Sequence, residues 1–257
     1  MPLSKQEWLA LEKKAHELRR LCLDTTYWAG SGHIGGGMSV MDMLTVLYHK
    51  YMRLDVKNPK WEDRDRFILS KGHAGIAYAP VLVDFGWNDP EQLKTFNHTN
   101  SKMGIHLDSN KVVGVDASTG SLGHGLPIAV GTALAARVLG KDYKTYCILG
   151  DGCMMEGIAA EAASLAGTLK LGKLIVLYDS NRITIEGATD LAFREDVGKR
   201  FEAYGWQVLR VSDGNDPDEI TAALEQAKQD ERPSLLIVPT TIGYGCPAKE
   251  GKASAHG

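Results

Sequence analysis

Apolar residues recur at helical spacing near the start of the chain and gather in short uninterrupted runs further along. Within residues 5–28, the apolar side chains from Trp8 to Cys22 follow one helix face, which predicts an amphipathic helix. A glycine-rich stretch comes next. Ser39, with Asp42 three residues later as a capping-box partner, then predicts the start of a second helix.

Short apolar strands alternate with helical segments along the rest of the chain. The predicted strands cover residues 66–69, 144–149, 173–178, 206–211 and 234–239, and the predicted helices cover 123–140, 155–169, 196–204 and 216–230. Buried strands alternating with helices predict an α/β fold with a doubly wound, mainly parallel sheet covered by helices on both faces. Because no repeat or low-complexity linker interrupts the pattern, we expect a single domain over residues 1–257.

Composition narrows the classes of partner. The formal net charge is −3 and no block of basic residues occurs, which argues against nucleic acid as a partner. The four cysteines form no CxxC pair, which is typical of reduced thiols in the cytoplasm. The first twenty residues lack the apolar core of a signal peptide, and every apolar run is too short to span a bilayer. We therefore expect a cytoplasmic protein with no membrane contact.

Polar residues follow two of the predicted strands at the points where the strands end. Gly150-Asp151-Gly152 follows one strand, and Asn181 follows the next strand along the chain. Consecutive βαβ units usually place their strands side by side, so both side chains should face one crevice. A carboxylate and an amide oxygen suit Mg²⁺ bound together with phosphate oxygens. An ordinary tight turn remains the alternative for either segment alone.

The string GDGCMMEGI, continued by SLAGTLKLGKLI and then YD.N.I.I.G, closely resembles the transketolases from Gly150 to Gly187. The resemblance extends over nearly the whole chain, from an SGH near its start to the final AHG. It implies the thiamine-diphosphate-binding fold, with thiamine diphosphate and Mg²⁺ as cofactors. The metal ligands that it implies are Asp151, Asn181 and the backbone carbonyl of Ile183. It also implies that Gly150 and Gly152 lie at the diphosphate and that Ile185 packs against the thiazolium ring.

Four histidines stand in motifs similar to those of the family: His33 in SGHIGGG, His73 in SKGHAG, His106 in MGIHLD and His256 in SAHG. Taken singly, each is as well explained by a surface position. The resemblance implies that His73 and His256 contact the diphosphate and that His33, His106 and His256 act catalytically on the substrate. It also implies that the loop Gly120-Ser121-Leu122 lies beside the aminopyrimidine, with Leu122 supporting the bent cofactor.

Two acids on the helix after GDG, Glu156 and Glu161, correspond to residues at the dimer interface of the family, although a solvated helix face explains them equally well. Some positions depart from the common pattern. Arg182 replaces a small residue after the metal-binding Asn. Leu107 replaces a proline, and segment 247–255 lacks an expected aspartate. The last two departures leave the sugar substrate open.

The glutamate that activates the aminopyrimidine ring in the transketolases has no counterpart among these residues. The resemblance therefore implies one subunit of a split transketolase. A second subunit with the pyrimidine-binding and C-terminal domains would complete an α2β2 enzyme acting on ketose and aldose sugars or their phosphates. Two alternatives stay open. One is a subunit of another thiamine diphosphate enzyme, such as a 2-oxoacid decarboxylase or a deoxyxylulose-phosphate-synthase-like enzyme. The other is a non-catalytic cofactor-binding module.

Overall fold

The computed structural model of the protein describes residues 2–185 and 187–257. The α-helices are α1 (Lys5–Ala29), α2 (Ile34–Ser39), α3 (Met41–Val46), α4 (Gly75–Asp84), α5 (Gly125–Val138), α6 (Asp151–Met155), α7 (Gly157–Thr168), α8 (Val197–Ala203) and α9 (Pro217–Ala227). A π-helical turn, η1, covers Leu47–Tyr51. Short 3-10 turns are η2 (Gly72–Ala74), η3 (Pro90–Thr95), η4 (Thr189–Leu191) and η5 (Ala253–Ala255).

The predicted doubly wound parallel sheet is confirmed. Its strands are β1 (Arg66–Leu69), β2 (Thr145–Gly150), β3 (Leu174–Ser180), β6 (Gln207–Arg210) and β7 (Ser234–Pro239). They lie in the order β1-β2-β3-β7-β6, and each neighbouring pair is parallel. A two-stranded antiparallel ribbon, β4 (Ile183–Thr184) and β5 (Gly187–Ala188), follows β3.

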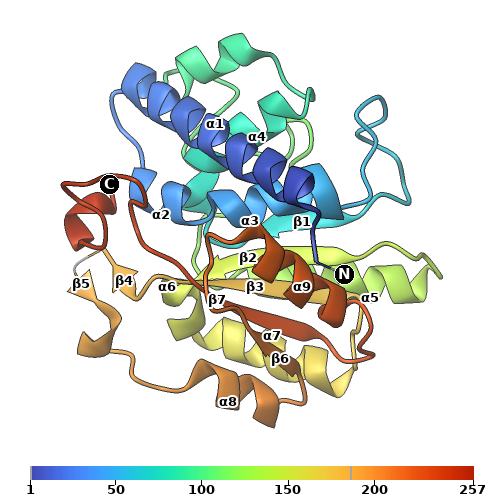
Figure 1. The fold of residues 1–257 in the computed structure, drawn as a ribbon. Helices are drawn as coiled ribbons and strands as arrows, with labels where there is room; N and C mark the ends of the chain where they lie inside the picture. The colour runs from blue at the N-terminus through green and yellow to red at the C-terminus, as the bar shows by residue number, and fades with distance from the viewer. Residues whose placement is uncertain (1, 186) are drawn as a thin grey trace.

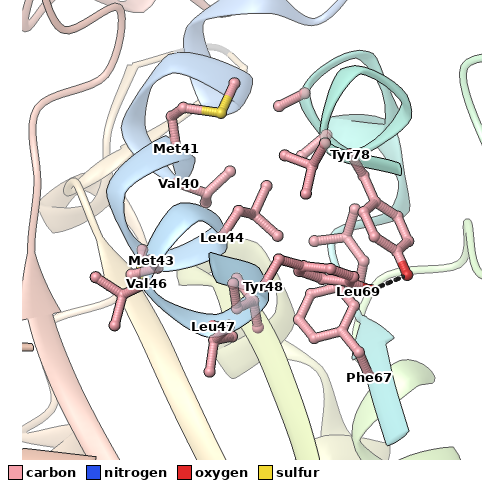
Figure 2. Packing of buried hydrophobic residues seen from close by; sticks show 14 of the residues in the cluster. Val40, Met41, Met43, Leu44, Val46, Leu47, Tyr48, Phe67, Leu69 and Tyr78 are labelled. Atoms are coloured by element: carbon pink, nitrogen blue, oxygen red, sulfur yellow. Dashed lines mark hydrogen bonds between the residues drawn. The ribbon is translucent and has the colours of Figure 1, made fainter. Parts of the chain in front are cut away.

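Helices cover both faces of the sheet because the side chains of each strand alternate between two apolar cores (Figure 1). In β2, Tyr146 and Ile148 pack with α1, α2, α3, α4 and α9, whereas Cys147 and Leu149 pack with α5, α7 and α8. Figure 2 shows the first core, in which Tyr48 of η1 packs against Phe67 of β1. The strands are therefore buried on both sides, as their unbroken apolar runs indicate.

The carboxyl ends of the strands meet at one edge of the sheet, where α2, α6, the β4–β5 ribbon and the C-terminal segment also gather (Figure 1). Gly150 of β2 is the register partner of Asp179 of β3. The predicted adjacency of the two strand ends is therefore confirmed. It brings the GDG turn beside the segment that carries Asn181.

Two predicted helices begin two residues later than expected. The helix expected at Ser39 is α3, which begins at Met41, and Ser39 is instead the last residue of α2, a separate helix formed by the glycine-rich segment. The Ser39 hydroxyl donates to the carboxylate of Asp179, and a capping box occurs instead at Ser4 and Glu7 of α1. The helix expected over residues 155–169 is α7, which begins at Gly157; the short helix α6 precedes it, and Glu156, in an extended conformation, separates the two.

Helix α4 and the β4–β5 ribbon were absent from the sequence prediction. Over the residues that the structure describes, no helix is both long and apolar enough to cross a lipid bilayer.

Candidate cofactor site

A cavity of about 330 Å³ opens at the carboxyl edge of the sheet. It is lined by the GDG turn and the segment after β3, and by histidines from four separate parts of the chain. Its lining residues are His33, Gly36, Lys71, His73, His106, Leu122, Gly150, Asp151, Gly152, Cys153, Asn181, Ile183, Thr184, Ile185, Ile242 and His256. Most of the residues that sequence patterns placed at the site therefore share one cavity.

Among the described residues that line this cavity, Asp151 is the acidic one. It is 4% exposed, and burial raises the pKa of its carboxyl above the ordinary value. The hydroxyl of Tyr178 donates to Oδ1 at 2.6 Å, and the backbone N–H of Arg182 donates to Oδ2 at 3.0 Å. These two bonds fix the carboxylate plane at the end of β2.

Asn181 and Ile183 line the same cavity beside Asp151. The backbone N–H of Ile183 donates to Asn181 Oδ1 at 3.0 Å, which turns the chain sharply after β3. Arg182, between them, has a φ of 61°, a left-handed conformation that is uncommon for residues other than glycine. The turn brings Asn181 and Ile183 to the cavity on either side of Arg182.

A buried ion pair lies behind this turn. Lys71 is 3% exposed and lines the cavity, and its Nζ donates to Oδ2 of the fully buried Asp179 at 2.5 Å. Asp179 also accepts hydrogen bonds from Ser39, Thr240 and the amide of Asn181. The pair was missed in the sequence because its members are 108 residues apart and share no local pattern. Only the side-by-side placement of β1, β2 and β3 brings them together.

Three histidine rings form a cluster over the cavity. Their centroids lie 5.3 Å apart for His33 and His73, 5.4 Å for His33 and His256, and 5.6 Å for His73 and His256. Burial and the charge of Lys71 lower the pKa of His73 to about 3. Burial also lowers the pKa of His33 and of His256. The cluster is therefore neutral near pH 7 and presents ring nitrogens that can accept or donate a proton.

His106 lies near this cluster, on the loop before α5. It is exposed and lines the cavity, and its Nδ1 lies 3.3 Å from the position that a Cβ on Gly120 would take. Leu122 also lines the cavity, whereas Gly120 and Ser121 do not. A Cβ on Gly152 would come within 3.0 Å of the Leu122 side chain, so the GDG turn and this loop are in close contact.

Three further candidates lie on the surface. Ile185 is 65% exposed at the open side of the cavity. Glu156 and Glu161 are both exposed, the first between α6 and α7 and the second within α7. Their proposed interface position is compatible with this exposure, and the structure assigns them no contact with the cavity.

Comparison with known proteins places this arrangement in a family. The sequence profile described as "Transketolase, thiamine diphosphate binding domain" matches residues 11–257. The chain belongs to the transketolase family. The transketolase of Geobacillus stearothermophilus is 47% identical over 252 residues, which are 93% of this chain and 38% of that relative. Transketolase 1 of Escherichia coli K12 is 43% identical over 95% of this chain and 38% of its own length.

Solved transketolase structures share the fold. That of Leishmania mexicana superposes with a TM-score of 0.93 at 38% identity and covers 96% of this chain and 38% of that chain. That of Campylobacter jejuni has a TM-score of 0.92 at 41% identity, over 96% of this chain and 40% of that chain. The present chain thus spans about 38% of the length of the curated transketolases that it matches, and it corresponds to their thiamine-diphosphate-binding domain.

Proposed function

We propose that residues 1–257 act as one domain that holds the diphosphate end of thiamine diphosphate through Mg²⁺. The domain would serve an enzyme that transfers a two-carbon ketol unit from a ketose to an aldose, or between their phosphates. The observation that carries this proposal is the convergence of Asp151, Asn181 and Ile183 with the histidine cluster in one cavity. Membership of the transketolase family supports the choice of cofactor.

The donor set fits Mg²⁺. Among the described residues, no cluster of three His, Cys, Asp or Glu side chains forms a metal cage. Asp151, Asn181 and Ile183 line the cavity, and we propose that the carboxylate of Asp151, the amide oxygen of Asn181 and the backbone carbonyl of Ile183 are the metal donors. Mg²⁺ commonly takes one or two carboxylates and completes its shell with water and phosphate oxygens. A cation would also favour the charged form of Asp151, which burial disfavours.

The surroundings of this donor set fit a diphosphate. Gly150 lies beside the side chain of Lys71, at 3.5 Å from the position of a Cβ, and the buried ammonium group of Lys71 would attract an anion at this turn. His73 also lines the cavity and offers an uncharged ring for a hydrogen bond. Gly152 presents backbone without a side chain at the same turn. We propose that these residues, with His256, hold the diphosphate oxygens.

The cofactor, when bound, supplies an electron sink for cleavage and formation of the carbon–carbon bond. The residues of this chain would orient the sugar and move protons. Because His33, His106 and His256 line the cavity and two of them are held neutral by burial, their ring nitrogens can bind sugar hydroxyls and take or return a proton. Leu122 would support the cofactor from the GDG side and Ile185 from the open side.

We propose that a second subunit completes the site in an α2β2 assembly and supplies the glutamate that activates the aminopyrimidine ring. Among the described lining residues, Asp151 is the acid, and its two hydrogen bonds hold it at the metal end. The large exposed fraction of Ile185 at the mouth of the cavity supports coverage by a partner. Glu156 and Glu161 are proposed to face such a partner. The four unpaired cysteines support a cytoplasmic location.

Thermal unfolding with pyrophosphate tests the diphosphate end without a partner. Mg²⁺ and inorganic pyrophosphate together should raise the unfolding temperature of the chain, and EDTA should abolish the rise. Asp151→Ala should remove the response. Asp142→Ala is the matched control, because that side chain is 80% exposed and precedes β2 at the opposite edge of the sheet. An undiminished response in Asp151→Ala would refute the metal assignment.

A ketol-transfer assay tests the need for a partner. The purified chain with thiamine diphosphate, Mg²⁺ and sugar phosphates should show no transfer, because the ring-activating acid is not among the cavity residues. Comparing ketose with 2-oxoacid donors after adding a candidate partner would separate ketol transfer from the other thiamine diphosphate reactions. Robust transfer by the chain alone would refute the two-subunit proposal.

A further inference from the structure

Three consecutive glycines, Gly35, Gly36 and Gly37, occupy the middle of α2, and all three are buried. Each faces a different neighbour at close range: a Cβ would lie 2.0 Å from backbone at Gly35 and 3.1 Å from side-chain atoms at Gly36 and at Gly37. Glycine destabilises a helix interior relative to alanine, so three in succession carry a cost that needs a compensating role. The neighbours of each glycine indicate what that role is.

Gly35 faces the C-terminal segment. A Cβ at Gly35 would lie 2.0 Å from the carbonyl oxygen of Ala255 and 2.6 Å from its carbonyl carbon. These are backbone atoms, which cannot move aside without moving the segment. The backbone N–H of Gly243 also donates to the carbonyl of Gly35 at 3.0 Å, which fixes the other end of the segment. His256 follows Ala255 directly, so the contact at Gly35 sets the position of its ring.

Gly37 faces the start of α4. A Cβ there would lie 3.1 Å from the Ile76 side chain and 3.2 Å from the Cβ of Ala77. Turn η2, which carries His73, leads directly into this part of α4. Gly36, between the two, faces the Lys71 ammonium group, at 3.1 Å from the position of a Cβ. Lys71 also donates to the Gly36 carbonyl at 3.2 Å.

We propose that Gly35 and Gly37 are positioning residues that set the spacing of the histidine cluster. His33 is the N-cap of the same helix. Gly35 would therefore fix the separation of His33 and His256, and Gly37 that of His33 and His73. Gly36 would admit the Lys71 ammonium group beneath the diphosphate. This inference rests on the proposed function for its meaning, but the spacing itself is a property of the free protein.

NMR spectroscopy of two single variants separates the role of Gly35 from that of Gly37. In the histidine-labelled chain without cofactor, the ring protons of His33 should show cross-relaxation with those of both His73 and His256. Gly35→Ala should lose the His33–His256 signal and keep the His33–His73 signal. Gly37→Ala should weaken the His33–His73 signal and keep the other. Histidine-to-glutamine variants assign the resonances.

Two other alanine variants serve as controls. Gly131→Ala is the matched one, because Gly131 also lies inside a helix and a Cβ there meets nothing within 4 Å. It should keep both ring signals and raise the unfolding temperature, as alanine does at an open helical site. Gly36→Ala should keep both signals, because the facing atom is the end of a long flexible side chain.

The proposal is overturned if Gly35→Ala and Gly37→Ala keep both ring signals and unfold at higher temperature, as Gly131→Ala should. If Gly35→Ala does not fold, the result for Gly37→Ala decides alone. This variant should fold, because the side chains that face Gly37 can shift by a few tenths of an ångström. Each outcome is independent of the cofactor. If Mg²⁺ and pyrophosphate do not raise the unfolding temperature of the unaltered chain, that result counts against the proposed function. It does not affect the conclusion on the spacing of the histidines.

Discussion

Replacing Asp179 or Lys71 breaks an ion pair that lies almost wholly inside the protein, and the two replacements should differ in cost. At the 2.5 Å separation of Lys71 Nζ and Asp179 Oδ2, an effective dielectric constant near 20 gives a gross attraction of about 7 kcal/mol. Desolvation of the two ions offsets most of this attraction. Removing one partner, however, leaves the other charge buried without a counter-ion, which lowers the free energy of unfolding by about 3–5 kcal/mol.

The remaining hydrogen bonds determine which replacement costs more. In Lys71→Met, Asp179 keeps donors from Ser39, Thr240 and Asn181, so we expect a loss of about 2–3 kcal/mol in the free energy of unfolding. In Asp179→Asn, the Lys71 ammonium group keeps the Gly36 carbonyl as its acceptor, so we expect about 3–5 kcal/mol. The double variant should lose less than the two single losses combined.

Urea unfolding followed by tryptophan fluorescence measures all four proteins, because the chain has five tryptophans. The same set should be tested for the pyrophosphate response. Lys71→Met should weaken it even where folding is intact, because the ammonium group lines the cavity. Single losses below about 1 kcal/mol, or strictly additive losses, would refute the inference that this pair is a coupled buried unit.

Three further predictions concern other parts of the molecule. His73→Gln should flatten acid unfolding: the pKa of His73 lies near 3 in the folded protein, so the unfolded chain binds more protons below pH 6.5. The unaltered protein should then lose about 2–4 kcal/mol more than the variant between pH 6.5 and 3; equal pH profiles would contradict this. Gly167→Ala should lower the free energy of unfolding by about 2–4 kcal/mol, because its Cβ would lie 1.8 Å from the Tyr204 carbonyl oxygen; stabilisation would count against that contact. Trp206→Phe should cost about 1–3 kcal/mol in urea unfolding, since the buried indole donates to the Ala163 carbonyl at 2.8 Å. A neutral effect would show that this bond contributes little.

The sheet could be predicted from the sequence because its strands are short apolar runs whose pattern does not depend on distant contacts. All five predicted strands occur, with bounds shifted by at most two residues. Helix α4 was missed for the opposite reason. It is apolar on every side and contains Pro80, so it shows neither a polar face nor an uninterrupted helical sequence. Its buried surroundings, which the local pattern does not reveal, make it a helix.

The candidate site could likewise be predicted only in part from the sequence. The adjacency of Asp151 and Asn181 followed from one rule about consecutive strands, and the family motifs named the histidines. The Lys71–Asp179 pair and the contact of Gly35 with Ala255 join segments more than a hundred residues apart. Their placement depends on the order of β1, β2 and β3 and on the path of the C-terminal segment. The local spacing of residues in the sequence reveals neither of these two contacts.

Buried charged groups occur in several parts of this protein, and some of them, such as Arg19 and Arg64, form ion pairs with Asp42 and Asp116 outside the candidate cofactor cavity. Three charged groups are buried at the carboxyl edge, namely Lys71, Asp151 and Asp179, beside a cluster of partly buried histidines. The lysines around the opposite edge, such as Lys141 and Lys173, form ordinary surface pairs with nearby aspartates. A sequence selected only for stability would replace buried charges with apolar side chains, because such replacements are often neutral or stabilising. The proposed ligand, a cation with the diphosphate that it accompanies, would account for retaining these charges at the carboxyl edge, where parallel sheets bind ligands.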